Sequence, residues 1–154
     1  MKRLIILFCI LLSLSSTRQV MAQNSVPFQW SQAMLTAIRN DFARPPMTAR
    51  NLFHFSLAMY DAWAAYDSVA STVFLGKTFN GFFCPYNGIV QPADIESARN
   101  AAMSFAAYRI IRNRYINSPG WNSVTNNMLN TLMGEMGYDV NFTSADYSGG
   151  DPKA

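Results

Sequence analysis

A helical stretch between residues 45 and 67 constrains the fold of this chain more than any other feature. Two prolines begin it, and their fixed backbone angle and missing N–H groups suit the first turn of a helix. The helical period places six large apolar side chains on one broad face: Leu52, Phe53, Met59, Tyr60, Trp63 and Tyr66. Small side chains form a second, flat face that another helix can approach closely: Ala58, Ala62 and Ala65. A helix that is apolar on most sides is typical of the middle of a bundle.

Three polar side chains interrupt this pattern. Arg50, His54 and Asp61 are spaced by four and seven residues, which places them within about 40° of one another around the helix. A buried charge needs a partner, so they are candidates for a buried polar network, formed with one another or with a neighbouring helix. A charge relay or an anion site is the functional alternative. We favour the structural interpretation, because an acid–base pair on one rigid helix has no open side by default.

Apolar residues recur at helical spacing on both sides of this stretch. The segment from Trp30 to Phe42 predicts a helix that ends at the Pro45-Pro46 pair, with Ile38 and Phe42 widening its apolar stripe. A second long helix is expected from about Asp94 to Ile116, with acidic residues in its first turn and three arginines in its last turns: Arg109, Arg112 and Arg114. We interpret these arginines as a solvated helix end, and an anion-binding patch is the alternative. A shorter helix should begin at Ser118-Pro119 and end at Gly137, with one apolar stripe: Trp121, Val124, Met128, Leu132 and Met136.

Residues 68–93 lose the helical period and carry several aromatic side chains between glycines and prolines. Such a long loop usually packs over a neighbouring surface. We expect it to cover an exposed edge of the bundle, and a lid over a substrate channel is the alternative.

Residues 1–22 have the composition of a secretory signal peptide. Lys2 and Arg3 precede an apolar run of eleven residues from Leu4 to Leu14, and Val20-Met21-Ala22 supplies the cleavage position. The run is too short to span a bilayer comfortably, so an uncleaved membrane anchor is the weaker alternative. We therefore expect an exported protein, periplasmic or secreted, with no stable membrane span after cleavage. Residues 23–154 then form the N-terminal helical part of a larger domain.

Removal of the signal peptide changes the charge of the chain. The whole chain carries 12 basic and 9 acidic residues, a net charge of +3, and three of the basic residues (Lys2, Arg3 and Arg18) leave with the signal. Nine basic and nine acidic residues remain, which gives a net charge of zero and no electrostatic case for binding nucleic acid or an anionic membrane. Cys84 is then the only cysteine, so no internal disulfide is expected.

Five segments of the chain carry a resemblance to a known family. They are Ala-Ile-Arg-Asn-Asp-Phe-Ala-Arg-Pro (37–45), Ala-Arg-Asn-Leu-Phe-His (49–54), Met-Tyr-Asp-Ala-Trp-Ala-Ala-Tyr-Asp (59–67), Ala-Ala-Met-Ser-Phe-Ala-Ala-Tyr-Arg-Ile-Ile (101–111) and Ser-Pro-Gly (118–120). Together they resemble the N-terminal helices of bacterial vanadium-dependent haloperoxidase-like proteins, which share an all-helical fold with the type-2 phosphatidic acid phosphatases. For a full-length relative, the resemblance implies a vanadate cofactor and haloperoxidase or acid phosphatase activity.

The oxyanion-binding motifs of that superfamily are absent from this chain. The first places a lysine seven residues before an Arg-Pro pair, but Ala37 stands at that distance from Arg44-Pro45. Neither Pro-Ser-Gly-His nor a Ser-Arg pair followed by a histidine occurs. Such a pocket also needs two histidines, one bonding the central atom and one serving as acid–base, and the chain has one. We expect no catalytic, cofactor-binding or metal site here, and no activity from residues 23–154 alone.

The predicted fold class is therefore all-α: a partial helical bundle of two long helices plus a shorter one or two, preceded by a signal peptide. The predicted function is that of the N-terminal structural helical region of an exported vanadium-dependent haloperoxidase-like protein. Its expected partner is a C-terminal helical half that is missing from this chain. Gly149-Gly150-Asp151-Pro152 is typical of the start of a further helix, which adds to the expectation of a truncated sequence. The alternative is a self-contained secreted helical binding or scaffold module without catalysis.

Overall fold

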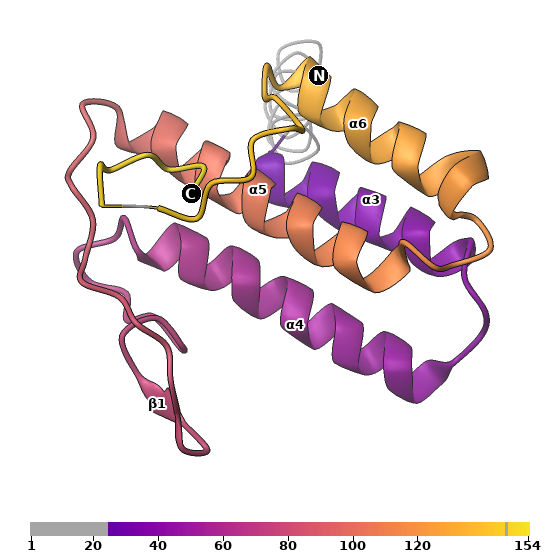
Figure 1. Ribbon diagram of the computed structural model, residues 1–154, viewed down its shortest axis with the longest axis horizontal. Coiled ribbons are helices and arrows are strands. Elements are labelled where there is room, and N and C mark those ends of the chain that lie inside the picture. The colour runs from indigo at the N-terminus through magenta and orange to yellow at the C-terminus, as the bar shows by residue number, and fades with distance from the viewer. Residues whose placement is uncertain (1–24, 147) are drawn as a thin grey trace, which may run out of the picture.

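A computed structural model describes residues 25–146 and 148–154 as a partial helical bundle (Figure 1). Its helices are α3 (Val26–Arg39), α4 (Pro45–Ala64), α5 (Ile95–Tyr115), the π-helix η1 (Trp121–Thr125) and α6 (Asn126–Glu135). A single small antiparallel sheet, formed by β1 (Thr78–Phe79) and β2 (Phe82–Phe83), completes the described part of the chain. The predicted all-α class is confirmed, with α4 and α5 as the two long helices. The predicted signal peptide, residues 1–22, lies outside the described residues.

Helix α5 occupies the middle of the bundle. The helices α3, α4 and α6 all pack against it, and buried side chains follow one another around its circumference: Ala98, Ala101, Phe105, Ala107, Tyr108 and Ile111. The helix begins as predicted, because the Asp94 carboxylate accepts the Ser97 backbone N–H at 3.1 Å and caps the first turn.

Helix α4 begins at Pro45 as predicted, but the expectation that it lies in the middle of the bundle is wrong. It packs mainly against α5 and buries Phe55 and Met59 there, whereas Leu52, Phe53 and Tyr60 of its predicted aromatic face are exposed. The physical reason is that one neighbouring helix covers only part of the circumference of α4. Apolar side chains on the remaining circumference therefore stay at the surface.

Helix α3 ends earlier than predicted, at Arg39 and not at the proline pair. The Asn40 side chain turns back and its Nδ2 donates to the Thr36 carbonyl at 2.8 Å, while the Asn40 carbonyl accepts the Gly120 N–H at 3.0 Å. These two bonds replace the next helical turn. Phe42, which was expected to widen the apolar stripe, is consequently exposed.

The loop between α4 and α5 forms a β-hairpin that extends away from the helices (Figure 1). Thr78 pairs with Phe83 and Phe79 with Phe82. Asn80 and Gly81 connect the strands with positive φ values of 48° and 80°, as a tight two-residue hairpin turn requires. The expectation that the aromatic loop packs over a neighbouring surface is therefore wrong for the hairpin, whose three phenylalanines are exposed.

A π-helical turn, η1, precedes α6 and shifts the register of the last helix. Leu129 and Met133 are fully buried together with Thr125, whereas Val124 of the predicted stripe is exposed. A π turn holds one residue more than an α turn, so it rotates the face that meets the core. The helix stops where predicted, because Gly137 adopts a left-handed φ of 77° that favours glycine.

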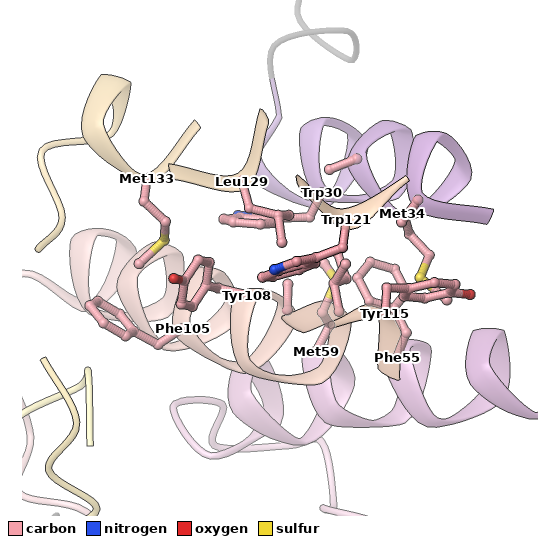
Figure 2. Close-up of a cluster of buried hydrophobic side chains, with 14 residues drawn as sticks. Trp30, Met34, Phe55, Met59, Phe105, Tyr108, Tyr115, Trp121, Leu129 and Met133 are labelled. Carbon is pink, nitrogen blue, oxygen red and sulfur yellow. The ribbon is translucent and has the colours of Figure 1, made fainter. Parts of the chain in front are cut away.

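Fourteen buried side chains form one hydrophobic core at the junction of α3, α5, η1 and α6 (Figure 2). Phe55 and Met59 close this core from the side of α4. Trp30 is fully buried, and its indole Nε1 donates to Ser104 Oγ at 3.0 Å, so its polar atom is satisfied. The core lies on one side of the α4–α5 pair, and the other side carries the candidate site.

Candidate functional site

Helices α4 and α5 run antiparallel (Figure 1), and a polar contact joins them near each end. At the end of α4, Arg99 Nη2 donates to the Asp67 carboxylate at 2.8 Å and to the Tyr66 carbonyl at 3.0 Å. At the opposite end, Arg114 Nη2 lies 2.8 Å from His54 Nδ1. The small side chains of both helices lie between these two contacts.

A groove with a cavity of about 490 Å³ runs along the outer side of this helix pair. Its floor is made by alanines from both helices: Ala58, Ala62, Ala65, Ala102 and Ala106. The loop after α4 contributes apolar side chains to its wall: Phe74, Leu75 and Ile89. The size and lining are typical of a ligand- or helix-binding surface. The C-terminal residues 151–154 also line the groove. The alanine face predicted on α4 therefore borders a groove and does not lie under another helix of the described chain.

Asp61 is a buried anchor for the loop. Its Oδ1 accepts the Val73 N–H at 2.6 Å, and its Oδ2 accepts the N–H groups of Phe74 and Leu75 at 2.8 and 3.2 Å. Only 5% of the residue is exposed, and the three donors compensate the buried charge.

The structure does not bring the three predicted network residues together. Arg50 is exposed and Asp61 bonds the loop, while His54 is half-buried and contacts Arg114 of the neighbouring helix. Asp61 and His54 both line the groove. The partners of Asp61 and His54 come from other segments of the chain, and no spacing within α4 indicates them.

Arg109 is a groove residue that sequence reasoning missed. We expected it to belong to a solvated helix end together with Arg112 and Arg114, but it is half-buried. Its guanidinium donates to the carbonyls of Ser144 at 3.0 Å, Ala154 at 3.2 Å and Phe142 at 3.4 Å. Burial lowers the pKa of Arg109. A signal was available, because Arg109 falls on the same face of α5 as Ala102 and Ala106.

The positions that correspond to the first vanadate motif do not form an oxyanion site. Ala37 is fully buried in the core, and Arg44 is exposed at the start of α4, where it stacks 5.1 Å from the Phe42 ring centre. His54 is the one histidine, and its Nδ1 is engaged by Arg114. In residues 25–146 and 148–154, no three histidine, cysteine, aspartate or glutamate side chains lie close enough to bind a metal. The residues present do not fit a vanadate group.

Two further properties of the described residues bear on function. The Cys84 thiol is free and half-buried. None of the helices within this part of the chain combines the length and apolarity needed to cross a bilayer. Comparisons with known protein families, with curated proteins and with solved structures find no match.

Proposed function

We propose that this chain is the N-terminal structural region of an exported, vanadium-dependent haloperoxidase-like protein, and that the groove between α4 and α5 seats a helix of the catalytic half. The groove is the single observation that carries this proposal. Its floor consists of alanines from two antiparallel helices, and small side chains allow a third helix to approach at the usual interaxial distance of about 8–10 Å.

The surface of the bundle adds support. Leu52, Phe53 and Tyr60 on α4 and the phenylalanines of the hairpin are exposed. Soluble monomeric proteins rarely leave large contiguous apolar areas uncovered. A second helical half that covers the outer side of α4 accounts for both features. In this arrangement the present chain supplies packing, and the residues that hold vanadate come from the other half.

The coding sequence downstream of Ala154 tests the proposal directly. We expect the reading frame to continue and to encode a lysine seven residues before an Arg-Pro pair, Pro-Ser-Gly-His, and Ser-Arg with a histidine six residues after the arginine. A stop codon directly after Ala154 would contradict it.

A stop codon would instead favour a self-contained secreted binding module. One observation supports this second candidate: the fourteen-residue core is built entirely from side chains between Trp30 and Met133. The chain thus forms a core without a second half.

A further inference from the structure

We propose that the helix seated in the groove presents a carboxylate to Arg114 and His54. This inference rests on the proposed function, because it takes the groove as the seat of a helix and adds the chemistry of that helix. It starts from the contact between Arg114 Nη2 and His54 Nδ1, which measures 2.8 Å. A guanidinium only donates hydrogen bonds, so Nδ1 is the acceptor and the imidazole proton lies on Nε2. The Nε2–H and the other guanidinium N–H groups are then donors for an incoming acceptor.

The charges around this contact are not balanced. Two ion pairs form within residues 25–146 and 148–154, Arg99–Asp67 and Lys153–Asp151, and neither includes Arg114. Two carboxylates line the groove; Asp61 is occupied by three backbone N–H groups and Asp151 by Lys153. The lining holds three cationic side chains, and Arg114 is the one that, among the described residues, contacts neither of these carboxylates nor a backbone carbonyl.

Other charges reinforce the positive potential at this end of the bundle. Arg50 lies one turn before His54 on α4, and Arg112 lies two residues before Arg114 on α5; both are exposed. Arg109, the remaining cation near the middle of the groove, is already engaged by three carbonyls. An acidic residue on a docked helix would therefore find its free donors at the His54–Arg114 end.

The rest of the groove favours apolar side chains on the occupant. Ala58, Ala62 and Ala106 form the floor beyond the His54–Arg114 contact. A helix with an alanine- and leucine-rich face and one glutamate or aspartate near its end matches both the shape and the charge. This is the partner chemistry that the groove selects.

Two synthetic helical peptides test the inference on the chain itself. Both carry the same alanine–leucine face and a fluorescent label, and they differ only by glutamate or glutamine at one position in the last turn. Fluorescence anisotropy at low ionic strength measures their affinities. We expect the glutamate peptide to bind about threefold to tenfold more tightly, since a charge-assisted hydrogen bond at a partly exposed site is weaker than a buried one. The difference should shrink at high salt.

Two arginine variants separate a specific contact from general positive charge. Arg114→Gln should abolish the preference for the glutamate peptide. Arg112→Gln removes the same charge from an exposed position that does not line the groove, and it should leave most of the preference intact. Near-UV circular dichroism confirms that each variant keeps the native packing.

Every outcome of the peptide experiment either supports or overturns the carboxylate contact. Equal binding of both peptides, no binding of either, or a preference that survives in Arg114→Gln would overturn the carboxylate contact. Equal and saturable binding would at the same time retain the groove as a helix seat. The proposed function fails on a different observation, the stop codon after Ala154, so the two failures are distinguishable.

Discussion

At the scale of single residues, Asp61 connects the end of α4 to the loop that walls the groove. Its buried carboxylate accepts three consecutive backbone N–H groups, from residues 73 to 75. Asp61→Ala should lower the free energy of unfolding by about 2–3 kcal/mol, because it leaves these donors without an acceptor. Urea denaturation measures the change. Asp61→Asn keeps one acceptor oxygen, so it should lower the free energy of unfolding by less than Asp61→Ala does. An unchanged urea midpoint for Asp61→Ala would contradict the anchoring role.

Asp67 predicts how stability depends on pH. The backbone N–H groups of Ala70 and Val69, together with Arg99, hold the pKa of Asp67 below its usual value. A carboxylate whose pKa is lower in the folded state stabilises the fold at pH values above its unfolded pKa of about 4. This contribution is lost as the pH falls through the folded pKa. Urea midpoints between pH 6 and pH 2 should therefore fall less steeply for Asp67→Asn than for the parent chain; parallel curves would argue against the contribution.

At the scale of the elements, Gly120 determines how η1 meets the end of α3. Its backbone N–H bonds the Asn40 carbonyl at 3.0 Å, and an added Cβ would lie 2.4 Å from Asn40 Cβ. Gly120→Ala should destabilise the chain by about 1–3 kcal/mol through overpacking. Gly134→Ala is the matched control, because nothing lies within 4 Å of its added Cβ; it should stabilise α6 by about 0.5–1 kcal/mol. Thermal or urea unfolding measures the stability of both variants. Equal changes in stability for Gly120→Ala and Gly134→Ala would exclude the close contact between Gly120 and Asn40.

The two tryptophans of α3 and α4 should differ in their contributions to stability. Trp30 is fully buried and bonds Ser104, so Trp30→Ala should cost about 3–5 kcal/mol. Trp63 belongs to the predicted aromatic face of α4, but it is half-buried and its ring centre lies 5.0 Å from the Arg99 guanidinium. Trp63→Ala should therefore cost only about 1–2 kcal/mol. If urea unfolding shows a larger loss of unfolding free energy for Trp63→Ala than for Trp30→Ala, Trp63 and not Trp30 belongs to the core.

The sequence predicted the elements better than their arrangement. The starts of α4 and α5 were predictable because Pro45 and Asp94 act locally, through backbone geometry and a capping hydrogen bond. The central position of α5 was not predictable from the sequence, because it depends on which faces of the four α-helices pack against one another. The His54–Arg114 contact joins residues sixty positions apart, and a pattern within one helix cannot indicate it.

At the scale of the whole molecule, the two sides of the α4–α5 pair differ. One side meets the fourteen-residue core, whereas the other is an alanine-floored groove with cations at its His54–Arg114 end. We propose that a further helix covers this groove in the native gene product.

Thiol labelling of the groove shows directly whether a further helix covers it. In a Cys84→Ser background, Ala106→Cys places a thiol in the groove. Ala107→Cys and Asn127→Cys serve as buried and exposed controls. Maleimide reaction rates, mapped by peptide mass spectrometry, are compared between residues 1–154 and the gene product expressed to its own stop codon. We predict that the Ala106→Cys thiol reacts readily in residues 1–154 and about tenfold or more slowly in the gene product, where labelling requires local opening. An equally fast reaction in both proteins would show that no helix covers the groove.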